Sequence, residues 1–206
     1  MFLKHLQVGF LDTNCYIIAD EESKDAAVID PGGDADNIIK VISDEKLMVK
    51  YIFLTHGHSD HIAALSKVKD ATNAKVAIHN KDAHMLSSPK HNLSIFFGKG
   101  LTQPSADITL NGDEMFNLGK LVLKIIHTPG HTPGGISIQV DNIVFTGDTL
   151  FAGSIGRTDF PGGSLDELIS SIKNKLLILE DDTKIFPGHG EPSTIAYEKS
   201  MNPFLQ

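Results

Sequence analysis

The sequence predicts an α+β protein with two similar halves, in each of which helices cover a β-sheet. In the first half, a strand ending in Asp-Pro-Gly (30–32) leads through a helix to a strand ending in Thr-His-Gly-His (55–58). In the second half, a strand ending in Thr-Gly-Asp (146–148) leads through a helix to one ending in Pro-Gly-His-Gly (187–190). Strand–helix–strand order is common by itself, but the matching polar ends favour an internal repeat. We therefore expect these four ends to meet along one edge.

Extended segments rich in branched residues are expected to form the strands. They cover residues 14–19, 26–30, 50–55, 74–79, 121–126, 136–140, 143–146 and 183–186.

Apolar stripes of helical period predict three helices. The first stripe runs from Ala35 to Ile42. The second covers residues 165–176, where Ser164 and Glu167 form a capping box at the helix start. A third helix is expected to begin near Asp60 and to turn three apolar side chains inward, namely Ile62, Leu65 and Val68.

The composition fits one globular domain in a reducing compartment. Hydrophobic residues make up 41% of the 206 residues, and no Pro/Gly/Ser linker interrupts them, so we expect residues 1–206 to form a single domain. The net charge of −8 gives no basic footprint for nucleic acid or an anionic membrane. Cys15 is the only cysteine, which excludes an internal disulfide. The sequence shows neither a signal peptide nor a run of about 18 apolar residues, so a cytoplasmic location is expected.

A polar cluster directly after the apolar run 51–54 is the main functional signal. Residues 56–61 read His-Gly-His-Ser-Asp-His. Crowded, buried imidazoles need partners and repel one another when protonated, whereas neutral imidazole and carboxylate are ordinary zinc ligands. A turn after the strand lets His56 and His58 point to one side, while Asp60 and His61 begin a helix and point to another. The alternative, a solvated polar loop, is disfavoured by the crowding.

Each of these two pairs leaves a metal ion short of ligands, so further ligands must come from elsewhere. His131 follows the strand 121–126 on a Pro-Gly turn, and Asp148 and His189 each follow a glycine at the end of another strand. An apolar strand, a glycine and then a ligand is the pattern of a functional loop on a rigid scaffold. Each turn alone is more often an ordinary turn, but together they supply the missing ligands.

Other residues near these motifs have weaker claims. His127 lies four residues before His131, but Pro129 separates their directions, so we expect His127 to pack or to support a ligand rather than to coordinate. Asp30 is expected either to orient a ligand imidazole or to stabilise the turn before Pro31. The remaining histidines lie outside any motif and are expected at surface or satisfied core positions: His5, His79, His84 and His91.

The motif at 56–61, followed by His131, Asp148 and His189, resembles the metallo-β-lactamase superfamily over essentially the whole chain. The resemblance implies a four-layer αβ/βα sandwich, in agreement with the repeat. It also implies two divalent metal ions, with zinc expected and iron or manganese as alternatives. The ligands implied are His56, His58 and His131 for one ion and Asp60, His61 and His189 for the other, with Asp148 bridging both.

Within the superfamily, residues 146–160 look most like the glyoxalase II group. Arg157 is the only arginine of the chain, and its planar cation suits a substrate carboxylate; the resemblance implies contact with the glutathione part of a substrate. The alternative is a structural salt bridge to Asp159 or Asp166. Asp159 stands where the group has a tyrosine, and the chain ends at Gln206, before the helical domain that carries further glutathione contacts in that group.

We therefore expect a dimetal hydrolase that acts on a small thiolester of the hydroxyacylglutathione kind. A thiolester is favoured because a thiol, with a pKa of about 8.5, leaves readily, whereas an amine would need a proton donor and only Asp60 is a candidate. Asp60 and Asp148 are the residues expected to act in catalysis.

The main alternative is a persulfide dioxygenase of the same superfamily, an oxidoreductase that holds one iron by two histidines and one aspartate. That group carries a similar Gly-Arg-Thr-Asp-Phe stretch (156–160), so occupancy of the second ligand set separates the two. Acidity disfavours a ribonuclease-type member, and the lack of an export signal disfavours a β-lactamase. A simple binding module would not need two complete ligand sets.

Overall fold

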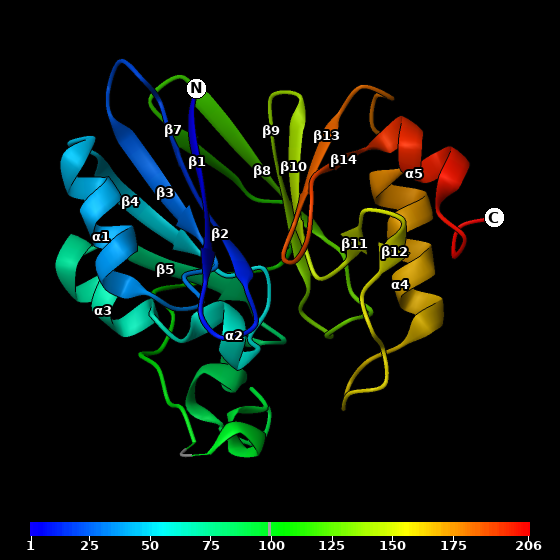
Figure 1. Cartoon of the computed structure of the whole chain (residues 1–206), viewed down its shortest axis with the longest axis horizontal. Helices are drawn as coiled ribbons and strands as arrows, with labels where there is room; N and C mark the ends of the chain where they lie inside the picture. Colours follow the sequence, from blue (N-terminus) through cyan, green and yellow to red (C-terminus); the bar gives the residue numbers. More distant parts are fainter. Residues whose placement is uncertain (99) are drawn as a thin grey trace.

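Two β-sheets lie face to face between two outer layers of helices in the computed structural model, which describes residues 1–98 and 100–206 (Figure 1). The strand order is β1–β2–β3–β4–β5–β6 in the first sheet and β14–β13–β10–β9–β8–β7 in the second. Helices α1 (Ala35–Asp44) and α3 (Leu65–Thr72) cover the first sheet, and α4 (Leu165–Ser171) and α5 (Ile195–Met201) cover the second. The predicted α+β sandwich is confirmed.

The strands fill the sheets in chain order. The first sheet contains β1 (Phe2–Val8), β2 (Thr13–Ala19), β3 (Asp25–Ile29), β4 (Met48–Phe53), β5 (Lys75–His79) and β6 (Ile108–Leu110). The second contains β7 (Met115–Leu118), β8 (Leu121–His127), β9 (Ile136–Val140), β10 (Ile143–Gly147), β13 (Lys184–Pro187) and β14 (Ser193–Thr194). The short elements between them are α2 (Ser59–Ile62), η1 (Ala83–Ser87), η2 (Ser94–Phe97), the hairpin β11 (Leu150–Phe151) and β12 (Ser154–Ile155), and the π-helical turn η3 (Ile172–Leu176).

The internal repeat is visible in the pairing of the strands. In the first half β2 and β3 pair antiparallel, and β3 then pairs parallel with β4 across the helix α1. In the second half β9 and β10 pair antiparallel, and β10 pairs parallel with β13 across α4. Because parallel neighbours end at the same edge of a sheet, the polar ends of β3, β4, β10 and β13 gather at one edge. A hydrogen bond from Ile136 N to Thr55 O (2.8 Å) joins the two sheets there.

Every predicted strand is present within two residues of its expected bounds, but the third helix differs from the prediction. Ile62, Leu65 and Val68 are fully buried as expected, yet they belong to two helices, α2 and α3. The backbone N–H of Ala64 is bonded to Pro31 O (2.9 Å), which lies outside the helix, and the helix breaks at this point. At the start of α4, Ser164 accepts the backbone N–H of Glu167, as the capping box predicts.

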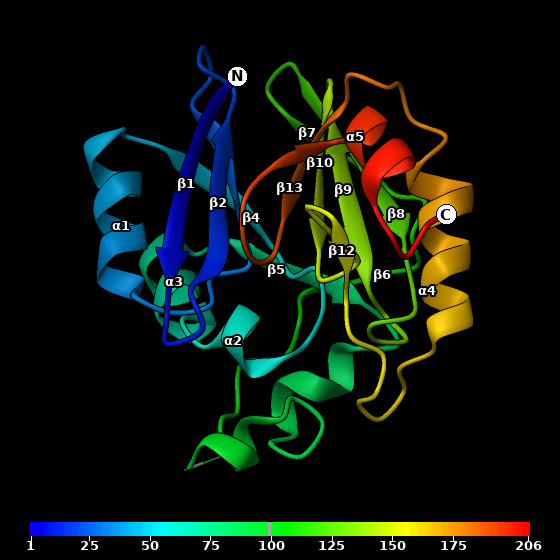
Figure 2. The ribbon, with the colours of Figure 1, turned by 45° about the vertical axis from the view of Figure 1, so that its right-hand side comes forward.

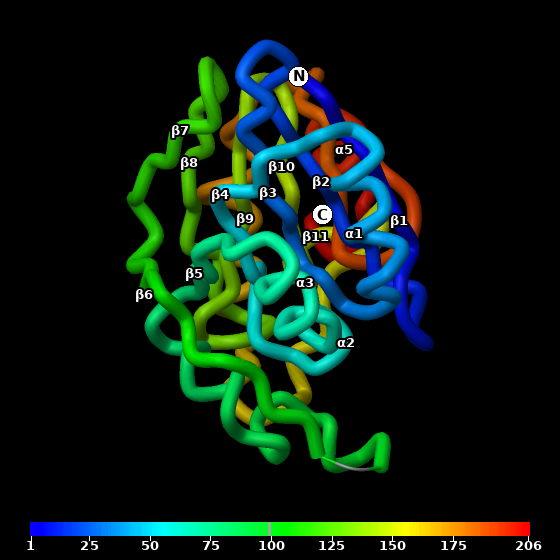
Figure 3. The backbone as a smooth tube through the Cα atoms, turned by 90° about the vertical axis from the view of Figure 1, so that its left-hand side faces the viewer, coloured from blue at the N-terminus to red at the C-terminus, as the bar shows by residue number. Residues whose placement is uncertain are grey.

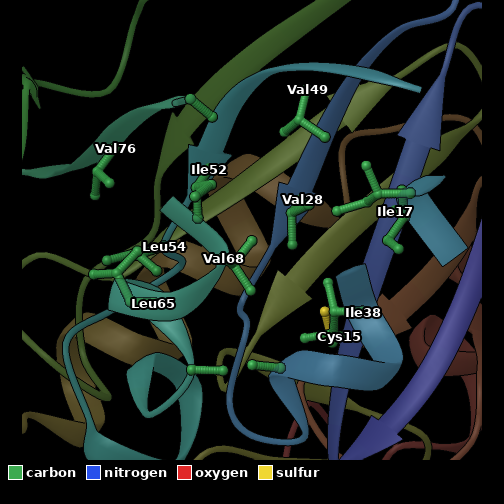
Figure 4. Close-up of a cluster of buried hydrophobic side chains, with 14 of the residues drawn as sticks. Cys15, Ile17, Val28, Ile38, Val49, Ile52, Leu54, Leu65, Val68 and Val76 are labelled. Carbon is green, nitrogen blue, oxygen red and sulfur yellow. The ribbon is translucent and has the colours of Figure 1, made fainter. Parts of the chain in front are cut away.

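Three hydrophobic clusters fill the three spaces between the layers. Side chains of β2 alternate between two of them, because successive residues of a strand point to opposite faces. Cys15 and Ile17 face α1 and α3, together with Ile38 and Val68 (Figure 4). Tyr16 lies in the second cluster, between the sheets, and the third packs α4 and α5 on the second sheet. Burial on both faces explains the continuous apolar runs that predict these strands.

The segment between β5 and β6, described for residues 80–98 and 100–107, extends beyond the sheets and lies next to α2 (Figures 2 and 3). Its contact with that helix is a hydrogen bond from Ser59 N to Asn92 O (2.8 Å). This segment therefore borders the edge where the polar strand ends gather. None of the helices in the described part of the chain is long and apolar enough to cross a membrane.

Candidate metal centre

The polar ends of both sheets bring the predicted ligands together in three overlapping groups. In each group the potential ligand atoms lie within 4.8 Å of one another. The groups are His56, His58 and His131; His56, His61 and Asp148; and Asp60, His61 and His189. All seven residues singled out as ligands therefore meet at one place, although they come from four separate strand ends.

The start of α2 separates the imidazoles of His56 and His58, which follow β4, from the side chains of Asp60 and His61 on the helix. His58 is extended (φ −70°, ψ 149°) and precedes the first helical residue, so it projects from the loop. Asp60 and His61 lie in the first turn of α2. This geometry produces the two directions expected from the motif.

In the first group, called here the triple-histidine group, the rings of His56, His58 and His131 meet edge to face. The centroid of the His56 ring lies 4.7 Å from that of the His58 ring and 4.8 Å from that of the His131 ring. His131 Nδ1 donates to the backbone carbonyl of Arg157 at 2.7 Å, so its Nε2 carries a lone pair. That Nε2 lies 3.0 Å from His58 Nδ1.

The second group, called here the mixed group, contains Asp60, His61 and His189. His61 Nδ1 donates to Asp30 Oδ2 at 2.9 Å, and His189 Nδ1 donates to Leu11 O at 3.2 Å. The Nε2 atoms of His61 and His189 then face each other, and they lie only 3.3 Å apart. Asp60 Oδ2 lies 3.2 Å from His189 Nε2.

Asp148 lies between the two groups. Its Oδ1 is 3.3 Å from His61 Nε2, and its Oδ2 is 3.7 Å from His131 Nε2 and 3.8 Å from His189 Nε2. One carboxylate thus faces imidazoles of both groups, which is the placement that a shared ligand needs.

The donor set fits metal ions better than it fits hydrogen bonding within the protein. Among the residues that the structure describes, the buried atoms His56 Nε2 and Asp148 Oδ1 have no hydrogen-bond partner. Such orphaned groups are costly in a protein interior. Without a metal ion, the facing Nε2 atoms of His61 and His189 also need protons shared with the carboxylates of Asp60 and Asp148. A cation between these atoms satisfies all of them, and imidazole with carboxylate suits divalent metals.

Burial and neighbouring charges hold His56, His58 and Asp148 in the protonation states that metal binding requires. Burial, with the neighbouring imidazole of His131, lowers the pKa of His58 to about 3. Burial also lowers the pKa of His56 well below its usual value. For Asp148 burial acts in the opposite direction, but the charge of His61 outweighs it and lowers the pKa. These groups therefore present neutral imidazole and ionised carboxylate near neutral pH.

A model of the metallo-beta-lactamase superfamily matches residues 8–189 of the chain. The chain belongs to this superfamily. Among its relatives, the hydroxyacylglutathione hydrolase GloC of Haemophilus influenzae is 42% identical over 215 residues, which cover 100% of this chain and 98% of GloC.

Solved structures of the superfamily share the whole fold. The BLEG-1 B3 metallo-beta-lactamase has a TM-score of 0.95 and 38% identity, covering 100% of both chains. TTHA1623, solved in a di-iron-bound form, has a TM-score of 0.87 and 30% identity over 98% of this chain and 100% of its own. ETHE1 from Myxococcus xanthus has a TM-score of 0.83 and 30% identity over 98% of this chain and 84% of its own. The protein is thus a member of a metallo-hydrolase superfamily, and its histidine–aspartate cluster suits divalent metals.

Asp30 and His127 take different roles beside the cluster. Asp30 orients a ligand imidazole: besides His61 it accepts the backbone N–H of Thr55 at 2.7 Å and the Thr55 hydroxyl at 2.5 Å. His127 stands outside the three groups. Its ring stacks on His79 at 4.0 Å, and its Nε2 donates to Pro133 O at 2.9 Å. The structure thus places His127 in packing, as we expected.

Arg157 reaches the rim of the cluster with its side chain already paired. Its Nε and Nη2 donate to the two carboxylate oxygens of Asp159 at 2.7 and 2.6 Å, so the salt bridge considered as an alternative does form. The guanidinium also lies 3.9 Å above the centre of the Phe160 ring. That ring is 5.7 Å from the ring of His58, which places Arg157 beside the triple-histidine group.

Two residues that hold the His189 turn escaped the sequence analysis. Asn14 donates to Pro187 O at 3.0 Å and to Gly190 O at 2.9 Å, and the Tyr16 hydroxyl donates to Pro187 O at 2.7 Å. The only available signal was a polar Asn14 in a strand that is otherwise apolar and buried.

We expect Asp148→Ala to lower the metal content by at least about half and to abolish hydrolysis, because this carboxylate faces both ligand groups. Metal analysis of the purified variant measures this, with Asp44→Ala as a control for loss of an exposed carboxylate. A variant that keeps its full metal content and turnover would contradict the assignment.

We expect His131→Ala to weaken zinc binding by more than about 100-fold and His127→Ala by less than about 10-fold, since only His131 lies in a ligand group. Competition titration with a chromophoric chelator measures both. Equal losses of zinc affinity in the two variants would show that His127 also binds metal.

Proposed function

We propose that the protein is a dimetal hydrolase of thiolesters, of the glyoxalase II type, with zinc as the expected metal and iron or manganese as alternatives. The observation that carries the proposal is the presence of two ligand groups that share the carboxylate of Asp148. When bound, two adjacent ions would supply a hydroxide nucleophile near neutral pH and polarise a carbonyl oxygen. The residues described above would hold and orient that centre.

The chain's own groups divide this work. Asp148 supplies negative charge to both groups, while Asp30 and the carbonyl of Arg157 fix the tautomers of His61 and His131. Asp60 is the carboxylate at the centre with the larger side-chain exposure, 16% against 12% for Asp148. Of the two carboxylates, Asp60 is therefore the one more open to water and substrate.

A thiolester fits these groups better than an amide. A thiolate leaves without a proton, whereas an amine needs a donor, and a carboxylate is a poor one at neutral pH. GloC, a hydroxyacylglutathione hydrolase, supports a small glutathione thiolester as the substrate. The chemistry of such a substrate also suits a single cationic side chain at the rim, which Arg157 provides.

A persulfide dioxygenase is the second candidate. The similarity to ETHE1 fits this alternative, and the di-iron form of TTHA1623 shows that iron binds in a related protein. The two functions differ in metal and in co-substrate, since an oxygenase consumes dioxygen and a hydrolase does not.

The test uses protein purified without added metal. Zinc, iron and manganese are measured per chain, followed by hydrolysis of S-lactoylglutathione, oxygen uptake with glutathione persulfide, and hydrolysis of a chromogenic β-lactam, included because of BLEG-1. We expect about two metal ions per chain and thiolester hydrolysis. One iron per chain with oxygen uptake would favour the dioxygenase, and β-lactam hydrolysis alone would reject the thiolester.

For Arg157 we expect the alanine variant to lower kcat/KM by on the order of 10–150-fold, mostly through KM, because a charge-assisted contact with an anionic substrate is lost. Arg157→Lys should recover only part, since lysine lacks the planar fork. Steady-state kinetics and the melting temperature are measured on the same preparation. Asp159→Asn is the control, because it breaks the ion pair but keeps the arginine. If both arginine variants have a lower melting temperature and a normal KM, Arg157 has a structural role alone.

A further inference from the structure

A second buried carboxylate, Asp82, lies next to the metal centre without belonging to any of its ligand groups. Asp82 is fully buried and precedes η1, the short helix that follows β5. Burial raises the pKa of its carboxyl, and hydrogen bonds from Thr132 and Gly134 act in the opposite direction. A buried carboxylate is costly unless its hydrogen bonds are made, so the partners of Asp82 indicate what it does.

The first set of partners belongs to the loop that carries His131. Asp82 Oδ2 accepts the hydroxyl of Thr132, the residue after His131, at 2.6 Å. Asp82 Oδ1 accepts the backbone N–H of Gly134 at 2.7 Å. A Cβ at Gly134 would lie 2.6 Å from the Asp82 carboxyl carbon, so this approach requires glycine. The carboxylate thus holds two residues of the turn that follows His131, one on each side of Pro133.

The second partner belongs to the loop that carries His56 and His58. Gly57 lies between these two histidines, and its backbone N–H lowers the pKa of the Asp82 carboxyl. Met85 of η1 packs tightly against the same glycine: a Cβ added at Gly57 would lie only 2.6 Å from the Cβ of Met85. The helix that Asp82 starts is therefore packed against the His56–His58 loop.

We infer that Asp82 is a positioning residue for the triple-histidine group, because its carboxylate bonds to the His131 loop of the second sheet while the helix that it starts packs on the His56–His58 loop of the first. A metal ion held by three imidazoles needs their nitrogens at one fixed separation, and these imidazoles come from different sheets. The mixed group is held by other contacts, chiefly Asp30 on His61 and Asn14 on the His189 turn. Asp82 thus sets the affinity of one ion and leaves the other unchanged.

The test measures zinc affinity in two backgrounds, each of which disables one ligand group. His189→Ala leaves the triple-histidine group as the complete one, and His58→Ala leaves the mixed group. Adding Asp82→Ala is expected to weaken zinc binding by about 10–100-fold in the first background, the usual cost of losing a group that orients ligands. In the second background the affinity should change by less than about threefold. Equal weakening in both backgrounds, or none in the first, would overturn the inference.

Two milder variants keep the test informative if Asp82→Ala does not fold. Asp82→Asn can still accept from Gly134 and can donate to the Thr132 hydroxyl, so it keeps both links and should retain most of the affinity. Thr132→Val removes only the hydroxyl link and should fall between the two. An asparagine variant as weak as the valine variant, or weaker, would contradict a role in linking the loops.

The matched control is Asp20→Ala. Asp20 also bridges two turns, accepting from Ser23 N at 3.3 Å and Lys120 N at 3.4 Å, but it lies at the opposite end of β2 from the metal centre. It should leave zinc affinity unchanged in both backgrounds. The inference rests on metal binding by the three histidines and not on the thiolester reaction. If the His189→Ala background itself binds no zinc, the inference falls together with the assignment of the three histidines as ligands.

Discussion

The structure depends on one electrostatic constraint, the crowding of imidazole nitrogens and carboxylate oxygens at the meeting point of two sheets. The Nε2 atoms of His61 and His189 face each other at 3.3 Å because the other nitrogen of each ring already donates to an oxygen. In water such rings would move apart. Here the strand ends that carry them fix their positions, so a bound proton or a metal ion has to neutralise the crowded site. The three hydrophobic clusters stabilise the backbone that imposes this arrangement.

Close contacts require glycine at the positions before Asp148 and His189. This explains the sequence pattern of a glycine followed by a predicted ligand. A Cβ at Gly147 would lie 2.4 Å from the Thr55 hydroxyl, and one at Gly188 would lie 2.3 Å from Asp148 Oδ1. Gly147 also has a positive φ of 49°, which other residues adopt at a cost. Only glycine therefore lets the ends of β10 and β13 approach the end of β4 closely enough for Asp148 to reach imidazoles of both groups.

The sequence predicts the parts of this structure that depend on local pattern. Continuous apolar runs predict the buried strands, and polar residues at their ends predict the ligand positions. β1 and β7 are partly exposed and carry no such run, so their pattern is weak. The break between α2 and α3 depends on Pro31 O, which the sequence around Ala64 does not reveal. Asn14 and Asp82 escaped prediction for the same reason, because their partners lie 50 to 176 residues away in the chain.

The two ligand groups differ in charge, and this difference bears on their chemistry. Burial and mutual proximity keep His56 and His58 neutral, so protons compete little with a metal ion there. In the mixed group burial disfavours the charged imidazole, but the carboxylates of Asp148 and Asp60 outweigh it and raise the pKa of His61. Protons therefore compete with a metal ion more strongly at the mixed group than at His56 and His58. One ion should consequently be held across a wider pH range than the other, so the degree of occupancy of the mixed group decides whether the centre acts with one metal or two.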